Sequence, residues 1–206
     1  MTRPLTKFLL PAALLLPAAV HAQSSVTVSN QGNNQRTVID QSQALDSRVL
    51  VSQIGTNNQV TITQNDDDNE VELDISGSDQ THTLTQSGGA RNVARIDANG
   101  HGHTTDIRQD GWPGGENVAD ISINGSGNFV SLVQQAEAGL PNYAVALQAG
   151  SDNVALLSQS GSDNELSLTQ DGVGNFAELA QDGTGLSLGV TQNGGASITI
   201  HQTSGN

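Results

Sequence analysis

Residues 153–181 read NVALLSQ-SGSD-NELSLTQ-DGVG-NFAELAQ, which is three seven-residue segments joined by two four-residue linkers. Each segment begins with Asn and ends with Gln, and each linker carries Gly at its second position. The third and fifth residues of each segment are Ala or Leu, and mostly polar residues stand beside them. This period of two is typical of a β-strand with one buried face, whereas an amphipathic helix would show a period near 3.6.

The same unit, about 11 residues long, recurs along nearly the whole chain. Sixteen segments fit between residues 24 and 202, and 29 of their 32 inner positions are Val, Ile, Leu or Ala. The three exceptions are Thr37, His82 and Thr105. Internal repeats of this length indicate a stacked repeat fold rather than a conventional globular core.

Alternate segments differ at their last residue, so the true repeat is a pair of segments, about 22 residues long, in eight copies. One series ends in Gln every time: Gln41, Gln64, Gln86, Gln109, Gln134, Gln159, Gln181 and Gln202. The other series is mixed: Asn30, Gln53, Ile75, Ala98, Ile123, Gln148, Gln170 and Gln192.

The two kinds of linker also differ. The linker after the mixed series always carries a glycine: Gly32, Gly55, Gly77, Gly100, Gly125, Gly150, Gly172 and Gly194. Glycine adopts positive φ without steric cost, so these residues predict a tight turn in every copy. The linker after the all-Gln series varies and is longest at 111–116 and 135–141, which places all insertions on one edge.

These patterns predict an all-β fold, a β-solenoid of about eight two-strand coils forming two facing parallel sheets of amyloid-like, cross-β character. Residues at the same repeat position then lie above one another, and stacked amides bond along the axis. We expect such amide ladders at the eight Gln of the uniform series and at Asn58, Asn153, Asn164 and Asn175. The first and last segments keep the strand pattern, so we expect open edges without caps.

Composition and charge exclude several function classes. Only 34% of the chain is hydrophobic and 2% aromatic, Cys is absent, and the formal net charge is −14. The charge argues against a nucleic-acid groove, and we expect no nucleic-acid partner. We find no catalytic motif and expect no enzyme activity, no cofactor and no metal. We interpret the acidic turn at residues 66–68 as a solvent-exposed charged segment that opposes premature aggregation. His82 and His103 fall at strand positions that point inward.

The first 22 residues have the features of a secretory signal: Arg3 and Lys7, an apolar stretch, and Val20-His21-Ala22 as a small-x-small cleavage site. We therefore expect a signal peptide at 1–22 and one repeat domain at 23–206.

The repeats resemble the curlin family, whose unit reads Ser/Asn-x5-Gln-x-Gly-x-x-Asn-x5-Gln. Residues 47–64, 142–159 and 164–181 match it. The resemblance implies a secreted subunit that polymerises into extracellular curli-like amyloid fibres on the bacterial cell surface, for biofilm matrix and adhesion. It also implies a partner curlin or nucleator and an outer-membrane secretion pore with accessory proteins. The alternatives are a monomeric solenoid adhesin and an ice-binding protein, the latter suggested by outward threonines such as Thr61, Thr63 and Thr83.

Overall fold

The structure is a computed structural model that describes residues 24–89 and 91–204. Within these residues the chain forms sixteen β-strands and no helix. The strands are β1 Ser25–Asn33, β2 Arg36–Asp40, β3 Arg48–Thr56, β4 Gln59–Gln64, β5 Glu70–Ser78, β6 Thr81–Ser87, β7 Arg91–His101, β8 Thr104–Gly111, β9 Glu116–Ser126, β10 Phe129–Ala136, β11 Asn142–Ser151, β12 Val154–Ser162, β13 Glu165–Val173, β14 Phe176–Thr184, β15 Ser187–Asn193 and β16 Ser197–Thr203. The predicted signal peptide lies outside the described residues. In the part of the chain that is described, no helix of the length and apolar character needed to cross a membrane occurs.

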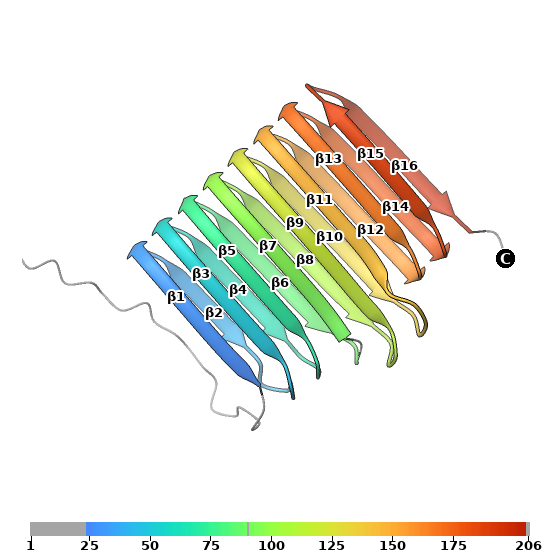
Figure 1. Ribbon diagram of the computed structural model, residues 1–206, viewed down its shortest axis with the longest axis horizontal. Helices are drawn as coiled ribbons and strands as arrows, with labels where there is room; N and C mark the ends of the chain where they lie inside the picture. Colours follow the sequence, from blue (N-terminus) through green and yellow to red (C-terminus); the bar gives the residue numbers. More distant parts are fainter. Residues whose placement is uncertain (1–23, 90, 205–206) are drawn as a thin grey trace, which may run out of the picture.

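The strands build two eight-stranded parallel sheets, one from the odd-numbered and one from the even-numbered strands. The order in each sheet follows the sequence, from β1 to β15 and from β2 to β16. One odd strand and the even strand after it make one coil, and the eight coils stack along a single axis (Figure 1). The prediction of an all-β solenoid of eight two-strand coils is confirmed.

The register keeps each repeat position in line through the stack. Gln134 of β10, for example, pairs with Gln109 of β8 on one side and with Gln159 of β12 on the other. Because the side-chain period of a strand is two, this register sends the same positions of every coil inward.

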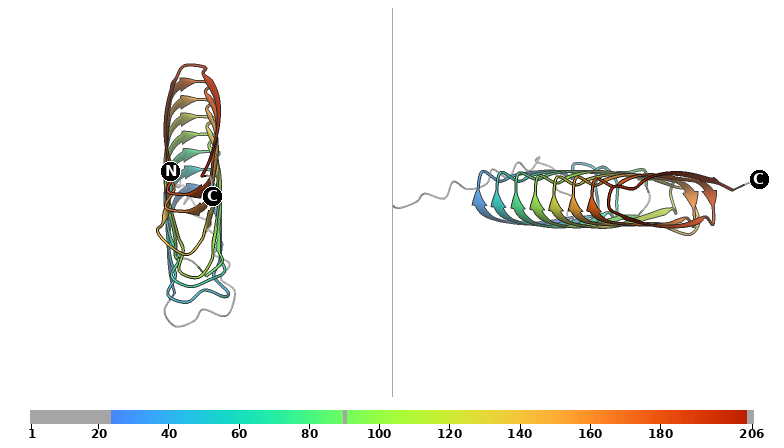
Figure 2. Two further views of the ribbon diagram at one scale, coloured as in Figure 1. Left: turned by 90° about the vertical axis from the view of Figure 1, so that its right-hand side faces the viewer. Right: turned by 90° about the horizontal axis from the view of Figure 1, so that it is seen from above.

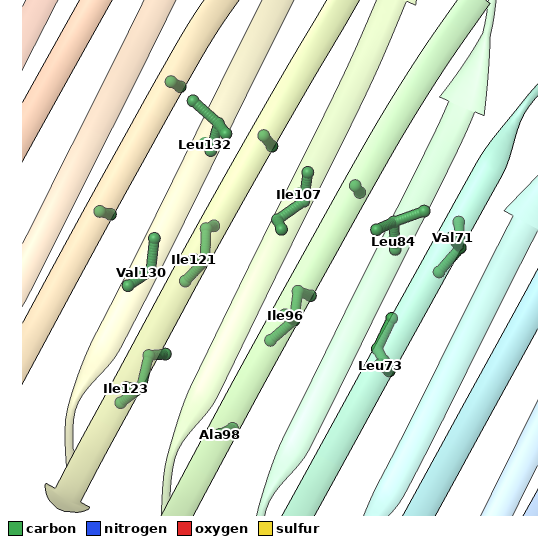
Figure 3. Close-up of a cluster of buried hydrophobic side chains, with 14 of the residues drawn as sticks. Val71, Leu73, Leu84, Ile96, Ala98, Ile107, Ile121, Ile123, Val130 and Leu132 are labelled. Carbon is green, nitrogen blue, oxygen red and sulfur yellow. The ribbon is translucent and has the colours of Figure 1, made fainter.

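The two sheets face each other (Figure 2), and a thin apolar core fills the space between them. It consists of the Val, Ile, Leu and Ala residues of the inner positions, most of them at most 3% exposed. In the middle coils Leu84, Ile107 and Leu132 form one row along the axis on the even-numbered sheet, and Ile96 and Ile121 form another on the odd-numbered sheet (Figure 3). Full burial of one such side chain contributes about 1.5–3 kcal/mol, so the long row of inner residues supplies most of the driving force for folding.

The three polar exceptions in the core are buried and have hydrogen-bond partners. Thr37 accepts hydrogen bonds from the amides of Asn30 and Gln53, at 3.3 and 3.0 Å. His82 Nδ1 lies 3.0 Å from the hydroxyl of Thr105 in the next coil. A buried polar group without a partner costs about 1–3 kcal/mol, and these pairings avoid that cost.

The glycines after the odd strands form a column in which the backbones of successive coils touch. Gly55 has a φ of 128°, and a Cβ placed on it would lie 1.8 Å from the carbonyl oxygen of Gly77. The same approach repeats from Gly32 to Gly150, at 1.8 to 2.0 Å. Only glycine fits here, because a Cβ would overlap the next coil. In addition, residues with a Cβ rarely adopt so positive a φ.

The opposite edge, on the lower right of Figure 1, carries the longer connections. Two residues, 163 and 164, suffice to join β12 to β13, but residues 112–115 join β8 to β9 and residues 137–141 join β10 to β11. All insertions therefore lie on one edge, away from the glycine column.

Candidate functional site

The eight glutamines of the uniform series form one uninterrupted amide ladder through the core. In each link the Nε2 of one glutamine donates to the Oε1 of the glutamine one coil further along, at 2.6 to 3.0 Å. The ladder runs from Gln41 in β2's turn to Gln202 in β16, and Gln64 to Gln181 are at most 1% exposed. Continuous pairing is what makes a row of buried amides tolerable in an apolar layer.

The second N–H of most of these glutamines joins the two sheets. Gln109 Nε2 also donates to the backbone carbonyl of Val93 at 2.9 Å, and Gln159 Nε2 to that of Tyr143 at 2.9 Å. The equivalent bond occurs in every coil from β5–β6 to β15–β16. Each glutamine therefore holds its coil closed and also binds the next coil.

The mixed series gives a shorter ladder. Gln148 donates to Gln170 and Gln170 to Gln192, both at 2.8 Å. Ile75, Ala98 and Ile123 occupy the same position in earlier coils, where they are at most 1% exposed and extend the apolar core.

The asparagines at the segment starts bond both to the backbone and to one another. Asn92, Asn117 and Asn142 each donate from Nδ2 to the Oδ1 of the asparagine one coil earlier, at 2.9 to 3.4 Å. Asn164 Nδ2 donates to the carbonyls of Ser160 and Gly183, and its Oδ1 accepts the amide N–H of Leu186. Asn58 and Asn153 follow the same pattern, as Nδ2 donates to Gly77 and Gly172 respectively. Asn175 adds a side-chain bond, from its Nδ2 to Asn153 Oδ1 at 2.9 Å. These residues brace the turns.

The glutamine ladder has a direction, because every link donates from the lower-numbered to the higher-numbered coil. The first member of each run is therefore left with a free acceptor. Gln41 Oε1 and Gln148 Oε1 are both buried and have no hydrogen-bond partner, and Asn30 Oδ1 at the same edge is also unpaired. Gln41 and Asn30 belong to the first coil, so the first position of both columns carries an unpaired acceptor.

Both ends of the stack are open sheet edges within the described residues. β1 and β2 end the two sheets on one side, and β15 and β16 end them on the other. The inner residues of these strands, such as Val28 and Ile200, are only partly buried although they pack against the core. A soluble solenoid normally covers such edges, because unpaired strands template further pairing.

The end strands carry little charge. β1 has no charged residue, and β2 has Arg36 and Asp40, whose charges cancel. β15 and β16 contain no acid or strong base, and His201 is their one titratable side chain. The 21 acidic residues of the chain thus avoid both edges almost completely.

Histidines inside the solenoid are held neutral. Burial lowers the pKa of His82 to about 3, with a smaller contribution from the charge of His103. Burial also lowers the pKa of His103, although hydrogen bonds to backbone carbonyls partly oppose the shift. Across residues 24–89 and 91–204, no group of three or more His, Asp or Glu side chains is arranged to hold a metal ion.

One comparison with known proteins gave a match. A family model described as the curlin associated repeat matches residues 161–194, which run from the end of β12 to the start of the turn after β15. The match supports a curlin-family assignment. No curated protein and no solved structure matched the chain. The curlin repeat and the solenoid are structural in character rather than catalytic.

The repeat pattern did not predict two further features of this curlin-repeat solenoid. Gly161 and Gly183 stack on the loop edge as the other glycines do on theirs, with a hypothetical Cβ 1.9 Å from the next carbonyl oxygen. On the outer face of the odd sheet, Arg48, Glu70, Arg91 and Glu116 form an ion-pair row: Arg48 lies 3.1 Å and Arg91 3.9 Å from Glu70, and Arg91 also pairs with Glu116. The sequence signal for this row is the alternation of opposite charges at intervals of 21 to 25 residues, about one repeat.

Proposed function

We propose that this chain is a secreted structural subunit that stacks end to end into extracellular curli-like amyloid fibres, which serve biofilm matrix and adhesion. The observation that carries the proposal is the unpaired Gln41 Oε1 at one open edge, in line with a ladder whose other end is Gln202. A second copy placed on that edge supplies the missing donor.

The two edges are complementary when the last coil of one copy lies on the first coil of the next. Continuing the observed register pairs Gln202 with Gln41, Ile200 with Ile39 and Val190 with Val28. The same register places Gln192 opposite Asn30, whose Oδ1 is also unpaired. Apolar residues thus meet apolar residues and donors meet acceptors.

The weak charge of the end strands favours the same contact. A net charge of −14 repels other copies at long range and keeps the free chain soluble. Because almost none of this charge lies on the end strands, the repulsion at contact is small. Since the joined edges are different surfaces, the contact is heterologous and does not close, and such contacts generate filaments.

The family resemblance is the basis for proposing how the chain is exported, which partners it has and where it is located. Export through an outer-membrane pore with accessory proteins, a partner curlin or nucleator, and a place on the bacterial cell surface are parts of this proposal. The match at residues 161–194 supports them only through the family.

The test is assembly of the purified chain after dilution from denaturant, followed by thioflavin fluorescence, electron microscopy and fibre diffraction. We expect unbranched fibres with reflections near 4.8 Å and about 10 Å. A chain that persists as a monomer would overturn the proposal and favour a monomeric adhesin or an ice-binding solenoid.

A matched pair of variants tests the ladder at the junction. Gln41→Leu leaves Gln202 of the incoming copy without its acceptor, whereas Ser167→Ala changes only an outward side chain on β13. We expect elongation to slow at least tenfold for Gln41→Leu and to change less than twofold for Ser167→Ala. Equal rates would show that the ladder does not template growth.

A further inference from the structure

The loops at residues 112–115 and 137–141 belong to adjacent coils, and a hollow opens between them on the loop edge. It has a volume of about 360 Å³ and is lined by residues of four successive coils, among them Gly88, Asp110, Trp112, Gln135, Glu137 and Ser160. A second hollow of about 380 Å³ adjoins it and is lined by Trp112, Pro113, Glu137 and Ala138. Trp112 and Glu137 line both.

The fold does not need these loops. Between successive repeat segments on this edge, residues 110–116 and 135–141 form seven-residue linkers, whereas the other linkers have four or five residues. Extra loop length on a rigid scaffold is where binding residues concentrate. The two insertions occur in adjacent coils, so their side chains meet.

The backbone fixes the positions of the two main side chains. Trp112 N–H donates to the carbonyl of Ala136, and Glu137 N–H donates to that of Gly161, both at 2.9 Å. A further bond from Gly115 N–H to the Trp112 carbonyl, also 2.9 Å, closes the turn around Pro113. Backbone hydrogen bonds between the coils therefore continue from the sheet into both loops and hold their backbones in place.

The side chains in the hollow have the chemistry of a site for organic cations. Trp112 is 73% exposed, and the face of an indole attracts cations through its quadrupole. Glu137 is exposed and makes no ion pair within the described residues, whereas Asp110 is partly balanced by Arg108 at 3.5 Å. No Lys or Arg lines either hollow.

We propose that Trp112 and Glu137 form a binding site for an organic cation, an ammonium or guanidinium group, on the loop edge of the solenoid. The alkyl part of the ligand lies on the indole ring and its charge lies at the Glu137 carboxylate. Gln135 and Ser160 offer polar contacts at the rim. Because the loop edge runs parallel to the stacking axis, the site stays open in a fibre and recurs once per copy.

Trp112 is the only tryptophan of the chain, so its fluorescence reports this site alone. The probes are choline, N-acetyl-lysine methylamide and arginine amide, which distinguish a quaternary ammonium headgroup from protein side chains. The matched neutral probes are 3,3-dimethylbutanol, which has the shape of choline without its charge, and the disaccharide cellobiose. We expect a saturable fluorescence change with at least one cation, at a concentration at least fivefold below that needed with dimethylbutanol.

Two carboxylate variants distinguish binding at this site from general electrostatic attraction to an acidic protein. Glu137→Gln should weaken cation binding at least fivefold, whereas Glu165→Gln, which removes an equal charge from an exposed position on β13, should change it less than twofold. Trp112→Leu, measured by calorimetry, should abolish binding while thioflavin-positive assembly proceeds at an unchanged rate.

Three results would overturn the proposal: no saturable change with any cation, equal binding of choline and dimethylbutanol, or tighter binding of cellobiose than of every cation. Equal weakening by Glu137→Gln and Glu165→Gln would do so as well.

Discussion

At the scale of single residues, the glycine column sets the strictest steric limit in the molecule. Gly55→Ala would place a methyl group 1.8 Å from the carbonyl oxygen of Gly77 at a φ of 128°. We expect it to lower the free energy of unfolding by more than about 3 kcal/mol, the upper range for single substitutions, as measured by urea denaturation.

Gly189→Ala is the control for that prediction. Gly189 has no neighbouring atom within 4 Å of a hypothetical Cβ and no positive φ. Its replacement should change stability by less than about 1 kcal/mol, in the stabilising direction. A Gly55→Ala chain as stable as the Gly189→Ala chain would refute the close packing of the column.

The buried His82 predicts acid sensitivity at the same scale. Its pKa is about 3 in the folded chain and about 6.5 when unfolded, so between these values the unfolded state binds more protons. Stability should therefore fall as pH drops below about 6.5, by at most about 1.4 kcal/mol per pH unit for this group. Urea midpoints at pH 7.5 and pH 5.0 measure the effect.

A double variant isolates this contribution. His82→Val with Thr105→Val removes both members of the hydrogen-bonded pair and restores the Val found at the equivalent positions 60 and 130. Both members of the pair are replaced, so neither is left alone, but the buried Gln80 Oε1 loses its 3.4 Å contact with His82 Nε2. Stability at pH 7.5 should therefore change by no more than about 1–3 kcal/mol, the cost of one unpaired polar group. The loss between pH 7.5 and 5.0 should shrink; an identical loss would assign it elsewhere, with His103 as the next candidate.

Individual positions differ in how well the sequence predicts them. The periodic Gln and Gly residues could be placed from spacing alone, because stacking puts every copy in the same environment. The asparagines could not, since whether an amide bonds to its neighbour or to a turn carbonyl depends on local turn geometry. Asn164, bonded to Ser160 and Gly183 carbonyls, is an example.

At the scale of strands and ladders, the Gln series acts as a unit. Gln134 receives a bond from Gln109 and donates to Gln159 and to the Val118 carbonyl. Gln134→Leu would remove a hydrogen-bond partner from one N–H of Gln109, from Gln159 Oε1 and from the Val118 carbonyl, and each buried group left without a partner costs about 1–3 kcal/mol. We expect a loss of at least about 3 kcal/mol in urea denaturation.

The neighbouring outward position gives the control. Ser131→Ala, on the outer face of the same strand, should change stability by less than about 0.5 kcal/mol. The mixed series already contains one apolar break, at Ile75, Ala98 and Ile123, and the glutamines on either side of it, Gln53 and Gln148, each keep an unpaired buried Oε1. A loss below about 1 kcal/mol for Gln134→Leu would show that the ladder contributes little to stability.

At the scale of the whole molecule, the fold is a one-dimensional stack whose ends resemble its middle. The number of coils, the two sheets and the edge that carries insertions could be predicted, because each is a property of the repeat. The direction of the ladder and the hollow at Trp112 could not. The first depends on the orientation of each amide, and the second on how two loops without a repeat pattern meet.

The central claim is that copies join head to tail, with β16 of one chain beside β2 of the next. The chain has no cysteine, so single cysteines can be placed at will. The register puts Thr199 opposite Val38 across the junction, and strands about 4.8 Å apart satisfy the geometry of a disulfide. The measurement is oxidation of assembled fibres made from Thr199→Cys chains, from Val38→Cys chains, or from an equal mixture.

The account predicts cross-linked dimers in fibres of the mixture and only traces in fibres of either variant alone. Dimers from Thr199→Cys alone or from Val38→Cys alone would mean that like edges meet. Fibres of the mixture without any cross-link would contradict stacking through these edges altogether.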